Sequence, residues 1–110
     1  MPDIPKARMT DREREFRSRL AQLVTRVAMA RGSISVREKS CGKPNCKCAR
    51  GEKHRALYLV ASQDGKLRQL FIPTKLESQA REAVEAYQSI REILEELSQI
   101  HWEKLKRRKL

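Results

Sequence analysis

The sequence predicts an α+β fold, in which an N-terminal helix, a small antiparallel β-hairpin sheet and a long C-terminal coiled-coil helix follow one another. Apolar residues recur at steps of three and four in residues 10–31 and again in 74–108, which is typical of amphipathic helices. Between these segments, residues 33–73 contain runs that alternate apolar and polar side chains, which is typical of strands. We therefore expect one domain over residues 10–110.

The first helix is predicted over residues 10–31, after a flexible N-terminus at residues 1–9. Thr10 and Glu13 form a T-x-x-E capping box, whose side chains satisfy amide groups of the first helical turn. Gly32 is well placed to end the helix. The apolar seam consists of Phe16, Leu20, Leu23, Val27 and Ala30.

The middle segment predicts a strand, a cysteine-rich loop and a hairpin. "SISVREK" alternates Ile34 and Val36 with polar neighbours and leads into the cysteines. Beyond the loop, "ALYLVAS" and "LRQLFI" flank Asp64-Gly65, a dipeptide that readily adopts the positive backbone angles of a tight hairpin turn. A sheet of two or three antiparallel strands follows from this pattern.

The last helix is predicted over residues 74–108 and ends in a basic tail. Pro73 ends the preceding strand, and Thr74 with Glu77 makes a second T-x-x-E box. The heptad seam consists of Leu76, Ala80, Ala83, Tyr87, Ile90, Leu94, Leu97 and His101.

The two predicted helices differ in length, which bears on assembly. At about 1.5 Å per residue the last helix reaches roughly 50 Å and the first only roughly 30 Å. An antiparallel pairing within one chain would then leave apolar residues near the C-terminus uncovered, so we expect a homodimer. The predicted dimer interface is Leu94, Leu97, Ile100 and Leu105.

Residues 41–54, "CGKPNCKCARGEKH", contain all three cysteines and one of the two histidines. The pattern C-x4-C-x-C-x5-H supplies four donors, which is enough for a closed tetrahedral Zn²⁺ site of the Cys3His type. Three cysteines cannot all pair within one chain, and a reducing cytosol disfavours disulfides. The predicted zinc ligands are Cys41, Cys46, Cys48 and His54.

Two other interpretations of the cysteines stay open. They can be unpaired thiols in an exposed basic loop, with His54 capping a strand. Alternatively, one cysteine with His54 can form a catalytic pair, because nearby lysines lower thiol pKa values. No orienting group or substrate pocket can be identified from so short a chain, so we favour metal binding and predict that the protein is not an enzyme.

The run "RGSISVREKSCGKPNCKCARGEKH", followed by a tyrosine-containing strand, a D-G turn and "FIPTKL", resembles a family of small uncharacterised bacterial proteins. Its members share an RGS-then-CGKxxCxCxxGxxH pattern and are often encoded near transposases and recombinases. The resemblance covers roughly residues 31 to 100 and implies that the cysteines and His54 act as one unit. Family members commonly carry "HGPYYYLS", where this chain has "HRALYLVAS" and keeps only Tyr58 as an aromatic.

The positive charge is concentrated in two segments. The chain has 25 basic and 14 acidic residues, a net charge of +11, which favours an anionic partner such as nucleic acid. It has neither a stretch of about 18 apolar residues nor the apolar core of a signal peptide, so we expect a cytoplasmic protein. The predicted nucleic-acid contacts are Arg37, Lys39, Lys43, Lys47, Arg50, Lys53 and Arg55 around the loop and Lys104, Lys106, Arg107, Arg108 and Lys109 in the tail.

Other cations and the aromatic residues receive different interpretations. Arg12, Arg19 and Arg26 recur every seven residues, and we favour their pairing with glutamates of the last helix over phosphate contact. Stacking on nucleobases has weak support. For at least two of the aromatic residues Tyr58, Phe71 and Trp102, core packing is the preferred interpretation.

Together these features predict a nonenzymatic, zinc-stabilised nucleic-acid-binding protein. We expect it to be dimeric, to bind DNA or RNA with DNA as the favoured partner, and to be associated with mobile elements or recombination. The alternative is a coiled-coil protein–protein adaptor with a recombinase or transposase partner, in which the long helix is the working surface and the charge is secondary.

Overall fold

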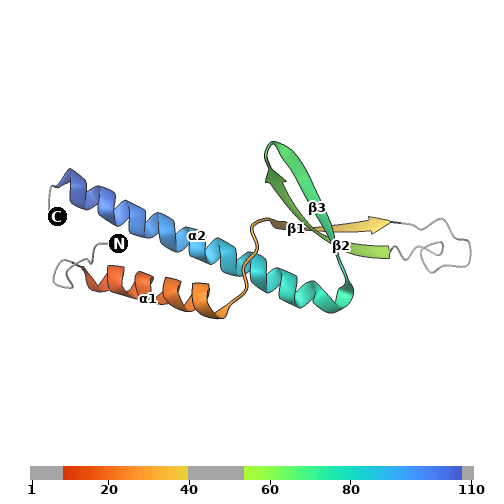
Figure 1. Cartoon of the computed structure of the whole chain (residues 1–110), viewed down its shortest axis with the longest axis horizontal. Helices are drawn as coiled ribbons and strands as arrows, with labels where there is room; N and C mark the ends of the chain where they lie inside the picture. Colours follow the sequence, from red (N-terminus) through yellow and green to blue (C-terminus); the bar gives the residue numbers. More distant parts are fainter. Residues whose placement is uncertain (1–8, 40–53, 108–110) are drawn as a thin grey trace, which may run out of the picture. The chain divides into compact units, whose positions relative to one another are not determined.

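A computed structural model of the chain describes residues 9–39 and 54–107 and confirms the α+β class. Its elements form two compact units, which are described separately. The helix pair consists of the first helix and the part of the last helix from Ala86 onwards, and the sheet unit spans residues 30–85. In chain order the elements are α1 (Asp11–Arg26), β1 (Ser33–Lys39), β2 (His54–Gln63), β3 (Lys66–Ile72), a 3-10 turn η3 (Thr74–Leu76) and α2 (Glu77–Lys106) (Figure 1).

Helix α1 begins as predicted and ends earlier than predicted. The Thr10 hydroxyl accepts a hydrogen bond from the Glu13 amide at 3.2 Å, and the Thr10 amide donates to the Glu13 carboxylate at 3.2 Å, so the capping box is confirmed. The predicted end at residue 31 is wrong, because the helix stops at Arg26 and Val27 is extended. The Thr25 hydroxyl donates to the Ala21 carbonyl at 2.6 Å. This local bond and the β-branched Val27 both weaken helix propagation.

Gly32 does not cap the helix but lets the chain approach strand β2. Its φ is +152°, a value that side-chain-bearing residues rarely adopt, and a Cβ here would lie 2.7 Å from the Val60 carbonyl oxygen. Two residues earlier, the Ala30 amide donates to the Ala83 carbonyl at 3.0 Å. Residues 27–32 therefore connect α1 to the sheet as extended chain.

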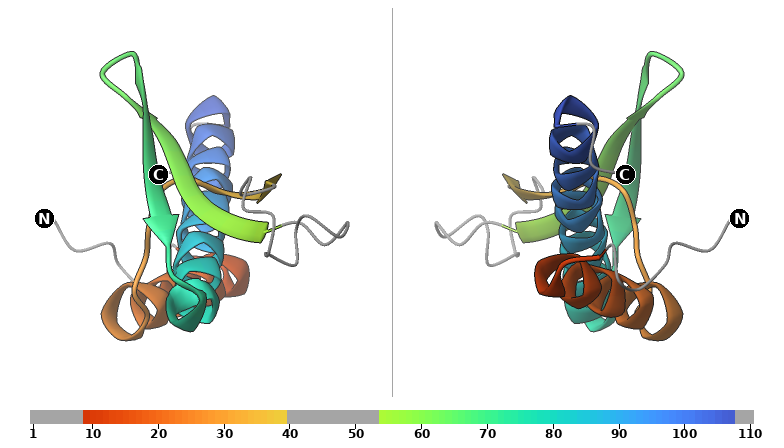
Figure 2. Two further views of the ribbon diagram at one scale, coloured as in Figure 1. Left: turned by 90° about the vertical axis from the view of Figure 1, so that its right-hand side faces the viewer. Right: turned by 90° about the vertical axis from the view of Figure 1, so that its left-hand side faces the viewer.

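The sheet has the antiparallel order β1-β2-β3 (Figure 2). Strand β1 pairs with β2 from Ser33↔Val60 to Lys39↔His54. Strand β3 pairs with β2 and is joined to it by the predicted turn, in which Asp64 and Gly65 have φ values of 53° and 76°. Two successive positive angles are what a tight two-residue hairpin requires.

One face of the sheet contributes to the core of the sheet unit. Leu57 is only 1% exposed, and its cross-strand neighbour Ile72 is also buried, as is Val84 of α2. Arg55 has the same parity as Leu57 in β2, and its guanidinium lies 3.0 Å from the carboxylate of Glu77 at the start of α2. Apolar burial and this ion pair both fix the first turns of α2 on the inner face of the sheet.

The predicted capping box at the start of the last helix is wrong. Thr74 is the first residue of the turn η3, whose N-cap is Pro73, and no side-chain hydrogen bond caps that turn. The Glu77 carboxylate, expected to cap, instead accepts a hydrogen bond from Arg55. Helix α2 therefore starts at Glu77, whose carboxylate is held by Arg55 of β2.

In the helix pair, α1 runs antiparallel to the C-terminal part of α2 (Figure 1). The Arg12 guanidinium lies 2.8 Å from the Glu96 carboxylate, and Lys104 forms an ion pair with Glu13. Helix α1 thus reaches almost to the end of α2. The premise that the C-terminal residues of α2 lie beyond the reach of the first helix is wrong.

The buried seam of α2 also differs from the predicted one. Ile90 and Ile93 are buried, whereas Leu94 is 52% exposed and His101 is exposed. The side of α2 that faces α1 consists of Ile93, Leu97, Ile100 and Lys104, which recur at steps of four, three and four. Of the predicted dimer residues, Leu97 and Ile100 are half-buried on this side, and Leu94 and Leu105 are exposed. Among the described helices, none is both long and apolar enough to cross a membrane.

Candidate functional site

Of the four predicted zinc ligands, only His54 lies among the described residues. Cys41, Cys46 and Cys48 lie outside the described residues. His54 is the first residue of β2 and pairs with Lys39, the last residue of β1. The β1–β2 ladder therefore holds together the two positions between which the cysteine-containing segment 40–53 leaves and re-enters the sheet. Within residues 9–39 and 54–107, no three His, Cys, Asp or Glu residues cluster as metal ligands would.

Apart from Arg37, the predicted phosphate contacts separate into three groups. Lys106 and Arg107 are exposed at the end of α2. Arg55 and Lys104 are each held by a carboxylate, of Glu77 and Glu13 respectively, rather than being unpaired surface cations. For Lys39 only the backbone is described, and the remaining predicted contacts, Lys43, Lys47, Arg50, Lys53, Arg108 and Lys109, lie outside the described residues.

Arg37 has a different environment from the other described cations of the sheet unit. Its guanidinium lies over the ring of Tyr58, 4.3 Å from the ring centroid, which is a cation–π contact. The same guanidinium donates a hydrogen bond to the side-chain oxygen of Gln69. Both partners are neutral, so the charge of Arg37 is held in place without being neutralised.

Tyr58 is also one half of an aromatic pair. Its ring meets that of Phe71 edge to face, with centroids 5.8 Å apart and an interplanar angle of 68°. Phe71 is 54% exposed, and Trp102 of α2 is 64% exposed. The prediction that at least two of Tyr58, Phe71 and Trp102 pack in the core is therefore wrong. Strand parity could have revealed this for Phe71, because Tyr58 and Phe71 are adjacent in sequence to the buried Leu57 and Ile72 and point to the opposite face.

We call the face opposite to Leu57 and Ile72 the outer sheet face, and define it by Ser35, Arg37, Tyr58, Gln69 and Phe71. The register places these residues on one side of the three strands. None of the strand residues that share this parity within 33–39, 54–63 and 66–72 is Asp or Glu. The face therefore combines exposed aromatic surface with uncompensated positive charge.

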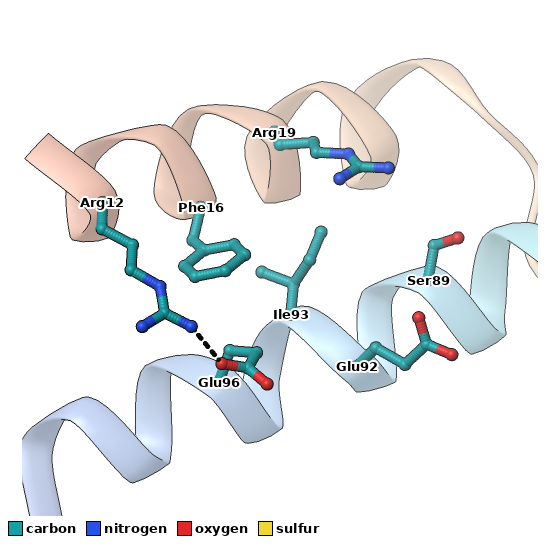
Figure 3. Close-up of a pocket in the computed structure, with 7 residues that line it drawn as sticks. All are labelled: Arg12, Phe16, Arg19, Ser89, Glu92, Ile93 and Glu96. Atoms are coloured by element: carbon teal, nitrogen blue, oxygen red, sulfur yellow. Dashed lines mark hydrogen bonds and ion pairs between the residues drawn. The ribbon is translucent and has the colours of Figure 1, made fainter.

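Of the three arginines that recur every seven residues in α1, Arg12 pairs with a glutamate of α2 as predicted. Besides its ion pair with Glu96, Arg12 lies over the Phe16 ring, 5.4 Å from the centroid. Phe16 and Ile93 point toward one another across a hollow of about 410 Å³, which Arg19 and Glu92 also line (Figure 3). Among the described residues, no carboxylate pairs with Arg19 or Arg26, so the predicted stripe of ion pairs is confirmed for Arg12 alone.

Glu13 is the one buried charged residue among those described, with 6% of its surface exposed. Burial by itself raises the pKa of this carboxyl. The hydrogen bond and charge of Lys104, together with the two bonds to Thr10, outweigh that effect and hold the pKa of Glu13 below its usual value. Glu13 therefore stays ionised and links the start of α1 to the end of α2.

A second exposed surface runs along α2, and we call it the α2 stripe. It consists of Leu94, His101, Trp102 and Leu105, which recur at helical spacing on one side of the helix. Leu94, Trp102 and Leu105 are 52%, 64% and 47% exposed. This is apolar surface on the side of α2 that α1 leaves open.

Comparison with known proteins gives one match. The family described as "Domain of unknown function (DUF6788)" matches residues 8–82. That span includes α1, the whole sheet, the cysteine-containing segment and the first turns of α2, whereas the α2 stripe lies outside it. No curated protein and no solved structure matches the chain.

Proposed function

This chain belongs to the family described as "Domain of unknown function (DUF6788)", and we propose that it is a nonenzymatic nucleic-acid-binding protein whose basic loop is organised by zinc. One observation carries the proposal. The pairing of Lys39 with His54 joins the two ends of a segment that holds all three cysteines. From Arg37 to Arg55 the chain has seven basic and two acidic residues, so this stretch of sequence carries a concentrated positive charge.

The donor set supports zinc as the ion. Three thiolates and one imidazole fit a closed tetrahedral site, which organises structure and does no chemistry on a substrate. Cys41 follows the last paired residue of β1 by two positions, and His54 belongs to the pair itself. Ligands at both ends of the segment would therefore be brought together by the ladder, with Cys46 and Cys48 between them.

The charge of the segment supports nucleic acid as the partner. Each phosphate that a lysine or arginine contacts releases condensed counterions, which gives affinity without base sequence. Lys43, Lys47 and Arg50 lie between the cysteines or directly after them, so a metal that fixes the cysteines would also fix these cations. We propose DNA as the main target, and the resemblance to proteins encoded near transposases and recombinases supports a role in mobile-element biology.

The proposal is tested with untagged protein and a labelled DNA duplex. Binding is measured by fluorescence anisotropy over a series of salt concentrations, before and after zinc is removed with a chelator. We expect log K to fall linearly with log salt, by about 0.9 per phosphate contact, and affinity to drop when zinc is removed. Absence of salt-dependent binding would overturn the proposal.

The α2 stripe favours one second candidate, a protein–protein adaptor. Exposed Leu94, Trp102 and Leu105 provide a helix face suited to a second apolar helix, either of a partner protein such as a recombinase or of a second copy of this chain. Sedimentation of the wild type and of Leu94→Glu tests the dimer. A dimer at tens of micromolar that the substitution dissociates would support self-association, whereas a monomeric wild type would contradict it.

A further inference from the structure

The outer sheet face has features that phosphate binding does not require. Cations alone are enough to hold a phosphate backbone. This face also presents the Tyr58–Phe71 pair and the guanidinium of Arg37 above the Tyr58 ring. Phe71 has 54% of its surface exposed, although an aromatic ring contributes most to stability when it is buried. The ring is therefore available to an external ligand.

A purely structural role accounts for only part of this arrangement. Cross-strand aromatic pairs stabilise antiparallel sheets, and the edge-to-face contact of Tyr58 with Phe71 fits that role. Sheet stability accounts for the position of Arg37 over the Tyr58 ring, since a cation–π contact is stabilising, but it does not explain why the charge of Arg37 meets only the neutral side chain of Gln69. It also does not explain why the strand residues of this parity include no carboxylate among those described.

One exposed aromatic ring beside an unneutralised arginine fits one class of ligand well. Single-stranded nucleic acid offers base faces that stack on aromatic rings and on guanidinium planes, and phosphates that meet the positive charge. In a duplex the same base faces are stacked on one another inside the helix. The outer sheet face therefore matches a strand whose bases are unpaired better than it matches a duplex.

We infer that the outer sheet face stacks the bases of single-stranded nucleic acid, with Phe71 as the main stacking ring and Arg37 beside it. This inference rests on the proposed function and specifies its substrate. Arg37 is the first basic residue of the segment that leads to the cysteines, and it lies two positions before Lys39 at the end of the ladder. The inferred site consists of residues of β1, β2 and β3 alone.

The test compares probes that differ in base exposure. Labelled oligodeoxythymidine and oligouridine of about 12 nucleotides, a length within the range of small single-strand binders, are titrated with wild-type protein beside a DNA duplex of equal length and a strand without bases. The variant is Phe71→Leu, which keeps an apolar side chain in the sheet. Its matched control is Leu70→Ala, because Leu70 is 60% exposed on the same strand and has the opposite parity.

We expect wild-type protein to bind at least one of the two base-bearing strands more tightly than the duplex and the strand without bases. Phe71→Leu should weaken that binding about tenfold, the size of one lost stacking contact, while Leu70→Ala leaves it unchanged. The salt slope should be unchanged in both variants, because neither alters a charge. Phe71→Tyr, which keeps the ring, should bind like the wild type and separates stacking from any loss of folding.

Two outcomes are distinguished by this design. If the wild type binds with salt dependence but is indifferent to the presence of bases, or if Phe71→Leu binds the base-bearing strands as tightly as the wild type, the inference is overturned and the proposed function stands. If neither the strands nor the duplex show salt-dependent binding, both are overturned.

Discussion

In the helix pair, Arg12 and Lys104 each meet a carboxylate, whereas on the outer sheet face Arg37 lies over the Tyr58 ring and meets only the neutral side chain of Gln69. The first arrangement uses positive charge to join two helices. The second holds a guanidinium in place and keeps its charge. In a chain with a net charge of +11, the basic residues therefore do not form one uniform surface. We propose that the sheet and its cysteine-containing segment bind the ligand and that the described ion pairs of the helices serve folding.

Removal of the metal should have the largest effect and should act on the sheet. We expect one zinc per chain, and Cys48→Ser should lose it, because apparent binding free energies of structural zinc are about 10–16 kcal/mol and are also folding free energies. Elemental analysis measures the zinc. In Cys48→Ser, amide hydrogen exchange should become faster than in the wild type, and this increase should be larger in β1 and β2 than in α1. Asn45→Ser, a nearby substitution that removes no ligand, should change neither.

The zinc content of the protein tests this prediction directly. Freshly purified, untagged protein that contains almost no zinc under reducing conditions would contradict it. So would a Cys48→Ser variant that retains zinc as well as the Asn45→Ser control does.

A substitution at Gly32 should be the next largest effect and should also act on the sheet. Gly32→Ala combines a strained φ of +152° with a Cβ 2.7 Å from a backbone oxygen. We expect a loss of about 3 kcal/mol in the free energy of unfolding, measured by urea denaturation. Gly65→Ala is the control, because φ there is +76° and nothing lies within 4 Å of a Cβ. It should cost only about 1 kcal/mol, and equal costs at the two glycines would show that the approach to Val60 is not tight.

Within the helix pair, the buried and the exposed ion pair should differ in their effects on stability. Glu13→Gln removes a carboxylate that is 6% exposed and binds both Lys104 and Thr10, so the free energy of unfolding should fall by about 2 kcal/mol. Glu96→Gln removes the exposed pair with Arg12 and should cost about 0.5 kcal/mol or less. Denaturation of both variants under identical conditions checks the difference. Similar losses would mean that burial of Glu13 adds nothing.

The same carboxyl predicts a pH dependence with a defined sign. Because the pKa of Glu13 is lower in the folded chain than its ordinary value of 4.5, the unfolded chain binds more protons between the two values. The stabilisation by Glu13 is therefore complete above about pH 4.5 and is lost as pH falls through the folded pKa. Glu13→Gln should lack this part of the acid destabilisation, and a wild type and variant with parallel stability curves below pH 4.5 would contradict the assignment.

The sequence predicts local features of this fold better than its packing. The capping box at Thr10 and the Asp64-Gly65 turn depend on a few adjacent residues, and both are confirmed. The role of Gly32 and the partner of Glu77 depend on contacts with distant strands, and both predictions are wrong. The predicted end of α1 is wrong for a local reason, because Thr25 and Val27 end the helix before Gly32. Heptad spacing alone also did not show which side of α2 meets α1. The predicted seam at positions 90, 94, 97 and 101 and the observed seam at positions 90, 93, 97 and 100 are equally regular.

The candidate site shows the same division. The cysteines and the charge clusters are evident in the sequence because they are local, whereas the outer sheet face combines residues from three strands. The exposure of Phe71 follows from the parity of β3 relative to the buried Ile72, a relation that becomes visible only when one buried position is known. The ion pair between Lys104 and Glu13 joins residues from the two ends of the chain, and no local pattern indicates it.

The most direct measurement compares two sets of four cations, one in the cysteine-containing segment and one on the helices. One variant replaces the segment residues Lys43, Lys47, Arg50 and Lys53 by Gln, and the other replaces the exposed helix residues Arg17, Arg19, Arg26 and Arg91 by Gln. Both lose the same charge, and duplex DNA binding is measured over a salt series. We expect the first variant to bind weakly, with a salt slope flatter by up to about 3.6 units, and the second to keep the wild-type slope. Equal slopes in the two variants, or a flatter slope only in the helix variant, would contradict the assignment of binding to the sheet and its cysteine-containing segment.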